Sequence, residues 1–218
     1  MKNSLKIIAV GVLSMFVTSA AIAGGAIGIA VTGASLDASG HEQLKTSANK
    51  TTHSTDENVT IASLFIENTN DDQGVTIGLE YIPYSAEAGS GSNTGDDDIE
   101  TSGTNTVNVD FKRHVTLYLE KSIGDLGLYV KGGLSQVTLV TNDSLSTGAK
   151  YPNEDMTGYV LGIGMKRELS NGFFFKIAGE RTMYDGATFK SSGSDAVTTV
   201  ELLELDINQA RLSIGKSF

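Results

Sequence analysis

Residues 158–168 read GYVLGIGMKRE and place two kinds of side chain at alternating positions. One parity carries the large apolar residues Leu161, Ile163 and Met165, and the other carries glycines followed by Lys166 and Glu168. A period of two predicts a β-strand, because successive side chains of a strand point to opposite faces. One face of this strand is apolar, and the other is small or charged.

Seven further segments alternate in the same way, and no helical period is sustained after residue 23. Strands are predicted at residues 25–33, 59–67, 75–84, 107–121, 126–140, 172–184 and 200–218. Short connections rich in turn residues are residues 68–74, 122–125 and 169–171. Long polar connections are residues 36–58, 85–106, 142–156 and 185–199. Because long and short connections alternate, we expect an eight-stranded antiparallel up-and-down transmembrane β-barrel with short periplasmic turns and long extracellular loops.

A soluble β-sandwich or lipocalin-like barrel would show the same alternation, so the position of the charges decides between the alternatives. The charged parity predicts a polar network inside the barrel, since eight strands enclose a space that side chains can fill. Its predicted members are Glu80, Lys112, His114, Glu120, Lys131, Lys166, Lys176, Glu180 and Arg211, and Glu67 shares their parity. On the apolar parity, Arg113 and Arg181 are predicted at the outer rim, in contact with lipid. This distribution favours a membrane barrel.

Two strands depart from strict alternation. The apolar parity of residues 200–218 switches between Ile207 and Leu212, which predicts a β-bulge at residues 208–209. A similar switch separates Leu134 from Val137.

The first 23 residues predict a cleaved secretory signal peptide. Lys2 and Lys6 precede the apolar residues 7–17, and residues 21–23 (AIA) form a small-x-small cleavage site. The apolar segment is too short to span a membrane as a helix. The barrel domain is then residues 24–218.

The composition excludes several classes of protein. The 218 residues contain no cysteine, which excludes disulfides and Cys-ligated metal centres. The formal net charge of −10 argues against a nucleic-acid-binding protein, which needs a basic surface. Most of the acidic excess lies in the four long connections, so we expect an acidic outer surface.

The C-terminal residues 211–218, RLSIGKSF, end in an aromatic residue that follows alternating apolar residues. With the signal peptide and the loop alternation, the chain resembles the small eight-stranded outer-membrane barrels: the OmpA barrel, OmpX/Ail and the OmpW or opacity-porin relatives. The resemblance implies the outer membrane of a Gram-negative-type cell. It also implies that the assembly machinery recognises Leu212, Ile214 and Phe218, although Lys216 departs from the pattern. We expect a monomer in contact with membrane lipids, including lipopolysaccharide.

No motif predicts catalysis, a metal site or a cofactor. His41 and His53 lack metal-ligand spacing, and His114 is expected to be a buried, hydrogen-bonded residue. Residues 96–100 (DDDIE) begin like a calcium loop, but Val109 stands where the last Glu ligand is needed, which leaves only a weak divalent-cation contact. We therefore expect a non-enzymatic structural or surface-interaction, adhesion-like protein that acts through its acidic loops. The alternative is a narrow porin-like channel for small solutes or cations.

Overall fold

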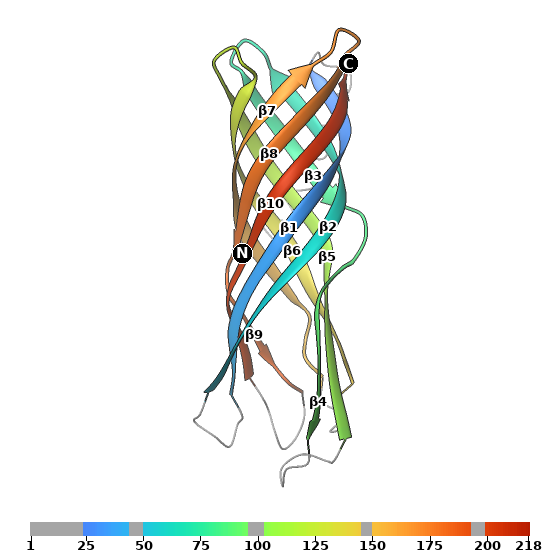
Figure 1. Cartoon of the computed structure of the whole chain (residues 1–218), viewed down its shortest axis with the longest axis vertical. Helices are drawn as coiled ribbons and strands as arrows, with labels where there is room; N and C mark the ends of the chain where they lie inside the picture. The colour runs from blue at the N-terminus through green and yellow to red at the C-terminus, as the bar shows by residue number, and fades with distance from the viewer. Residues whose placement is uncertain (1–23, 44–49, 96–102, 145–149, 193–198) are drawn as a thin grey trace.

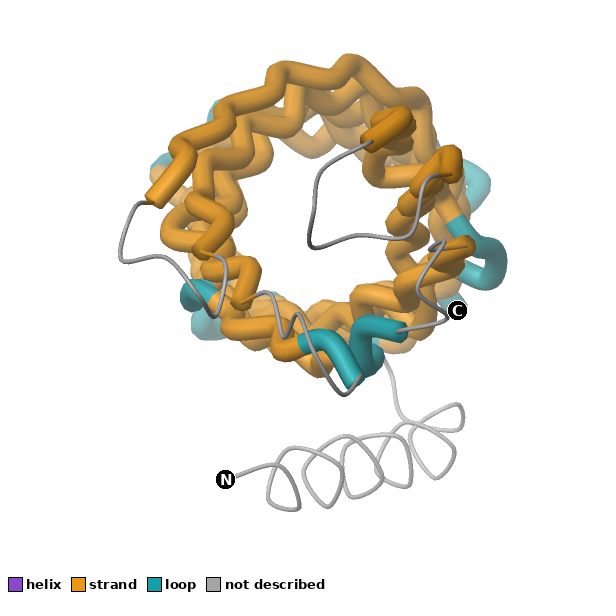
Figure 2. The backbone as a smooth tube through the Cα atoms, turned by 90° about the horizontal axis from the view of Figure 1, so that it is seen from below, coloured by secondary structure: helices purple, strands orange, loops and turns teal. Residues whose placement is uncertain are grey.

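The computed structural model describes residues 24–43, 50–95, 103–144, 150–192 and 199–218, and these form an all-β structure. The predicted signal peptide lies outside the described residues. The strands are β1 (Gly25–Gln43), β2 (Lys50–Asn70), β3 (Val75–Ile82), β4 (Ala86–Gly95), β5 (Gly103–Ile123), β6 (Leu128–Ser144), β7 (Glu154–Glu168), β8 (Phe173–Tyr184), β9 (Ala187–Lys190) and β10 (Thr199–Ser217). Neighbouring strands are antiparallel, and β1 pairs with both β2 and β10, which closes the sheet into a barrel (Figure 1, Figure 2).

The strands occupy eight positions around the barrel. β3 and β4 both pair with β5 and share one position, and β8 and β9 both pair with β10 and share another. Pro83 lies in the break between β3 and β4, where its missing N–H removes a donor from the ladder. The predicted up-and-down barrel of eight antiparallel strands is confirmed, and two of its strands are interrupted.

The strands run further than the alternation predicts at the end that carries the long connections. β1 and β2 stay paired as far as Gln43 and Lys50, through most of the predicted connection 36–58. We call this end the loop end. The turns at residues 71–74, 124–127 and 169–172 lie with the C-terminus at the opposite end, at the top of Figure 1, which we call the short-turn end. In the description that follows, "up" and "above" mean toward the loop end, which is at the bottom of Figure 1. Of the four predicted long connections, residues 36–58 and 85–106 therefore consist largely of paired strand.

Large apolar side chains form an exposed belt around the short-turn half of the barrel. Its members include Ile27, Ile29, Val31, Leu64, Tyr81, Leu119, Leu134, Leu161, Ile163, Ile177 and Leu212. Toward the loop end the belt gives way to outward polar residues, such as Ser35, which lies opposite both Asn58 and Asn208. Such a belt is the surface that a membrane barrel presents to lipid.

A β-bulge at the outer edge of the belt reverses the side-chain parity of β5. Lys112 pairs with Thr138 and Val115 pairs with Gln136, so the two residues between them on β5 oppose a single residue of β6. Arg113, in this bulge, has a φ of 53°, a conformation that costs a non-glycine residue about 1 kcal/mol. Beyond the bulge, Phe111 faces the interior.

The predicted bulge at residues 208–209 is wrong. β10 pairs with β1 without interruption from Ser217 to Glu204, and the register shift lies further up, between Ser39 and Gly40. Leu205 therefore keeps the inward parity of the charged positions below it, and it is buried. The apparent switch marks the height at which the interior changes from polar to apolar.

The same explanation applies to β6. Its ladder with β7 is continuous from Leu128 to Leu139, so Val137 lies on the inward parity of Lys131 and Ser135. Val137 is 1% exposed.

The backbone ladder is incomplete between β2 and β4. β2 pairs with β3 only from Leu64 to Asn70, and no described residue of β4 pairs with β2. Beside this break, the Ala62 N–H donates a hydrogen bond to Tyr84 Oη. At this place a side-chain hydrogen bond, rather than a strand ladder, connects β2 to the segment between β3 and β4.

Candidate functional site

Seven charged side chains fill the barrel interior at the height of the belt. We call this set the plug; it consists of Glu67, Glu80, Glu120, Lys131, Lys176, Glu180 and Arg211. Each of these residues, backbone included, is at most 8% exposed. A buried charge without a partner costs several kcal/mol, so each of these groups must be paired inside the barrel.

Lys176 joins two carboxylates in the lower part of the plug. Its Nζ donates to Glu120 Oε2 at 2.7 Å and to Glu67 Oε1. Tyr118 Oη also donates to Glu67 Oε1, at 2.8 Å. The second carboxylate oxygen of Glu67 is buried without a hydrogen-bond partner. Across the plug four carboxylates face three cations, so the negative charges are in excess by one.

Two further ion pairs form the upper part of the plug. Lys131 Nζ donates to both carboxylate oxygens of Glu180, at 2.9 and 3.0 Å. Arg211 donates to Glu80, which also accepts a hydrogen bond from Ser63 Oγ at 2.6 Å. Two carboxylates and two cations from β3, β6, β8 and β10 thus balance one another across the lumen.

Aromatic rings pack between these charges because inward glycines leave room for them. The ring and glycine pairs are Phe65 with Gly28, Tyr118 with Gly78, Tyr129 with Gly164 and Phe174 with Gly215. A Cβ atom at position 215 would lie 2.2 Å from Phe174 Cζ. Lys131 Nζ lies 4.3 Å from the centroid of the Tyr118 ring, in a cation–π contact. The short-turn half of the lumen is therefore filled.

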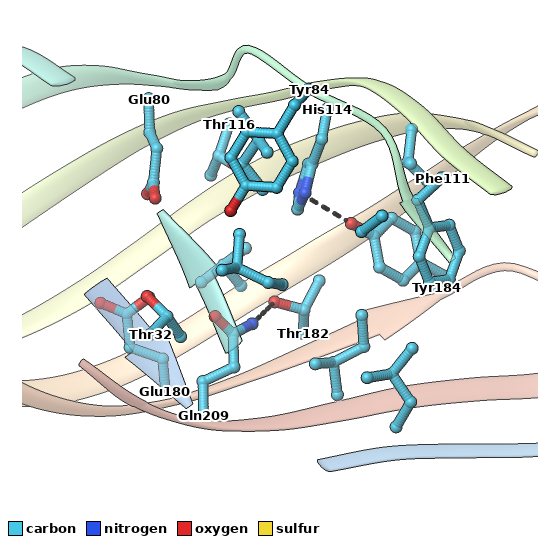
Figure 3. Close-up of a pocket in the computed structure, with 17 residues that line it drawn as sticks. Thr32, Glu80, Tyr84, Phe111, His114, Thr116, Glu180, Thr182, Tyr184 and Gln209 are labelled. Carbon is cyan, nitrogen blue, oxygen red and sulfur yellow. Dashed lines mark hydrogen bonds between the residues drawn. The ribbon is translucent and has the colours of Figure 1, made fainter. Parts of the chain in front are cut away.

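A layer of uncharged polar groups covers the plug toward the loop end. His114 Nε2 lies 2.7 Å from Ser135 Oγ and 3.0 Å from Tyr184 Oη. Gln209 Nε2 donates to Thr182 Oγ1 at 2.8 Å. His114, Tyr184, Thr182 and Gln209 line a cavity of about 40 Å³, which we call the lower pocket (Figure 3).

Above this layer the interior is apolar and hollow. A cavity of about 540 Å³, which we call the chamber, is lined mainly by Leu36, Ala38, Val107, Val109, Phe111, Leu139, Tyr151, Phe189, Val200, Leu202 and Leu205. Polar groups lie at its mouth: His41 Nε2 is 2.5 Å from Glu201 Oε2 and 2.6 Å from Lys50 Nζ. The plug separates the chamber from the short-turn end.

Eight of the nine predicted interior residues take one of three positions. Glu80, Glu120, Lys131, Lys176, Glu180 and Arg211 belong to the plug, and His114 lies in the layer above it. Lys166 lies near the short-turn end, where its Nζ is 2.6 Å from Glu168 Oε1.

The prediction that Lys112 belongs to the interior network is wrong, because its side chain faces outward. Its side chain is 39% exposed, and its Nζ lies 3.8 Å from Asp110 Oδ2. The bulge in β5 causes this reversal. The chamber lining was not predicted either. The signal that could have found it is the apolar residues at inward positions of β6 and β10.

The residues predicted at the rim and the C-terminus are all on the outer surface. Arg113 and Arg181 are exposed at the outer edge of the belt, and Arg181 forms an ion pair with Asp206. Leu212, Ile214 and Phe218 are exposed near the short-turn end. Their contacts with lipid and with the assembly machinery stay predictions.

Within the described ranges, no helix is long and apolar enough to cross a membrane. The same residues contain no group of three or more His, Asp or Glu side chains that could hold a metal ion. Residues 96–100, where a weak divalent-cation contact was left open, lie outside the described residues.

Comparison with known proteins shows the class of barrel. No protein-family model and no curated protein matches this chain. Among solved structures, the outer membrane protein OprG from Pseudomonas aeruginosa is 16% identical, with a TM-score of 0.56 over 90% of this chain and 96% of that one. The outer membrane protein AlkL is 13% identical, with a TM-score of 0.48 over 90% of each chain. Ail of Yersinia pestis is 14% identical, with a TM-score of 0.38 over 86% of this chain and 98% of that one.

The chain therefore has the fold of the small eight-stranded outer-membrane β-barrels. The resemblance seen in the sequence is confirmed at the level of the fold.

Proposed function

We propose that this chain is an integral outer-membrane protein that takes small apolar molecules into a chamber open to the outside of the cell. In barrels of this kind the long connections face outward and the short turns face the periplasm, which orients the chamber outward. The observation that carries the proposal is the chamber itself. Its volume of about 540 Å³ and its apolar lining match the usual size and chemistry of small-molecule sites.

The apolar surface of the chamber favours the binding of a ligand. Contact between apolar surface and water raises the free energy of the folded protein, and proteins retain such surface mainly where it contacts a partner. The chamber holds this surface above a plug that closes the straight route through the barrel.

Dye binding tests the proposal. The purified protein in lipid nanodiscs should bind the apolar dye N-phenylnaphthylamine saturably, above the uptake of empty nanodiscs. Leu205→Asn places an amide in the chamber wall and should weaken binding about tenfold, because burying an unpaired amide costs about 1–3 kcal/mol.

Leu203→Asn is the matched control, because Leu203 is 56% exposed on the same strand and should leave binding unchanged. Dye uptake equal to that of empty nanodiscs would overturn the proposal.

A surface-interaction role is a second proposal, and it is supported by acidic residues on the outer wall. Asp37 of β1 lies opposite Asp56 of β2 above the belt, and in the same row Asp206 of β10 is paired with Arg181. The two aspartates without this partner favour a basic partner. Nanodiscs that carry the protein should retain a lysine-rich peptide at low salt, and the variant with Asp37 and Asp56 changed to Asn should retain less. Equal retention by the two proteins would contradict this role.

The narrow channel for small solutes or cations remains the weaker alternative. The plug argues against it, because its ion pairs occupy the lumen. Purified protein in a planar bilayer should show little steady conductance. Large, stable channels would restore the porin-like alternative.

A further inference from the structure

The lower pocket and the chamber lie end to end inside the barrel. Leu36 and Phe111 line both cavities. The lower pocket therefore adjoins the inner end of the chamber, away from the mouth.

Both cavities have mainly apolar walls, and each also holds polar side chains. In the lower pocket these include Tyr84, Thr182 and Tyr184, which carry hydroxyl groups, and Gln209, which carries an amide. Figure 3 shows Tyr84 and His114 on one side of this pocket and Thr182 and Gln209 on the other. The Gln209 amide nitrogen is used by Thr182, which leaves the amide oxygen as an acceptor beside the pocket.

The volumes set the size of a group that each cavity can take. A single water needs about 10–15 Å³ on the scale on which the lower pocket measures about 40 Å³. The lower pocket thus admits a head of a few non-hydrogen atoms but no ring. The chamber, at about 540 Å³, accommodates the body of a small molecule.

The charges beneath the lower pocket decide the charge of that head. Glu80 and Glu180 both border the pocket, and Arg211 and Lys131 pair with them. An anionic head would meet these two carboxylates, and a cationic head would find both carboxylates already paired with Lys131 and Arg211. Since the four charges balance one another, a charged head would be buried without a partner, which costs several kcal/mol.

We propose that the ligand of this barrel is a small apolar molecule with one uncharged hydrogen-bonding head, such as an alcohol, bound with the head in the lower pocket. His114, Thr182 and Gln209 select the head, and the chamber selects the apolar body. This inference rests on the proposed function, because it names the class of molecule that the chamber takes.

Four eight-carbon probes test the proposal: octane, octanol, octanoate and octylammonium. Binding to the protein in nanodiscs is measured by calorimetry, and partition into empty nanodiscs is subtracted. Octanol should bind about three- to tenfold tighter than octane, the gain expected from one hydrogen bond between neutral groups. Octanoate and octylammonium should bind more weakly than octanol.

Gln209→Leu keeps the approximate volume of the side chain and removes its polar atoms. It should abolish the preference for octanol over octane. Thr182→Val should reduce the same preference. Asn208→Leu is the matched control, because Asn208 faces outward on the same strand, and it should keep the preference.

The outcomes separate the two proposals. If no probe binds above the level of empty nanodiscs, the proposed function itself is wrong. If octane and octanol bind equally well, or if Gln209→Leu keeps the octanol preference, the chamber binds apolar molecules but the lower pocket does not recognise a head. Tighter binding of octanoate or octylammonium than of octanol would overturn the uncharged head.

Discussion

The two halves of the barrel interior differ in chemistry, although the same strands form the wall of both. In the short-turn half, seven buried charges and four aromatic rings fill the lumen. In the loop half, inward positions of the same strands carry apolar side chains around a cavity of about 540 Å³. β10 shows the contrast within one strand, because Arg211 lies in the plug and Leu205, six residues away, lines the chamber.

The comparison teaches that burial in a small barrel does not require one kind of side chain. The plug is stable only if its charges stay paired, since each unpaired charge is costly. The chamber needs no partners for polar groups, but it leaves apolar surface near water, which disfavours an empty cavity. The short-turn half closes the barrel, and the loop half leaves space for a ligand.

The largest expected effect comes from removing a cation at the centre of the plug. Lys176→Met keeps the side-chain length and leaves Glu67 and Glu120 without their shared counter-ion. We expect a loss of about 3–5 kcal/mol in the free energy of unfolding, the cost of breaking a buried pair from one side. Urea unfolding in detergent, followed by heat-modifiable gel mobility, measures it.

Lys166→Met is the matched control for this prediction. The partner of Lys166, Glu168, is 63% exposed, so the pair is close to solvent and should contribute less than about 1 kcal/mol. Equal losses in the two variants would show that the plug does not behave as a buried network.

The second effect tests whether the plug is filled. Gly215→Ala brings a Cβ to within 2.2 Å of Phe174 Cζ, so the ring must move, and overpacking of this kind costs about 1–3 kcal/mol. Gly179→Ala, on the neighbouring strand, meets no atom within 4 Å and should leave the unfolding midpoint unchanged. A midpoint for Gly215→Ala equal to that of the native chain would mean that the short-turn half has free space.

These contrasts also show how much of the structure the sequence alone predicts. Alternation predicts the strands, their number around the ring and the common face of Lys131, Lys176 and Arg211 with the other charged residues, because a period of two separates two faces. It does not say which face is inside. Val137 and Leu205 resemble lipid-facing residues because lipid and the apolar interior of the loop half select the same side chains.

Two other features could not be predicted for a different reason. Lys112 points outward because of a one-residue bulge in β5, which inverts the alternation of side chains beyond it. The predicted loop at residues 36–58 is largely paired strand. Beyond Ala38 it carries polar residues at both parities, so no apolar parity predicts a strand there. Where both faces of a strand share one environment, the period of two is lost.

The third effect tests the charge imbalance of the plug. Glu67→Gln removes one of four carboxylates that face three cations, and the remaining oxygen can still accept from Tyr118 and Lys176. We expect a change below about 1 kcal/mol in the free energy of unfolding, because the lost charge was in excess. Glu80→Gln removes the carboxylate that pairs with Arg211, so it should lower the free energy of unfolding by more. Equal losses would indicate that both carboxylates are needed for charge balance.

The smallest effect lies outside the membrane-spanning wall, on the row of aspartates. The pKa of Asp56 is raised, first by a side-chain hydrogen bond with Asp37 and then by the charge of that residue. The folded barrel therefore binds this proton more tightly than the unfolded chain, in which an aspartate titrates near about pH 4. The stabilising contribution is fully present below the pKa of the unfolded chain and is lost as the pH rises through the raised pKa.

Asp56→Asn should remove this part of the pH dependence, because the amide carries no charge opposite Asp37 at any pH. The variant should gain stability over the native chain at about pH 7, and the gain should vanish at about pH 3, where Asp56 is protonated in the native chain. The gain should be small and should shrink in salt, because the pair is exposed. Unfolding midpoints at the two pH values measure it, and Asp125→Asn, in the turn at residues 124–127, is the control. A gain of equal size at both pH values, or the same gain in the control, would show that repulsion between Asp37 and Asp56 is not its source.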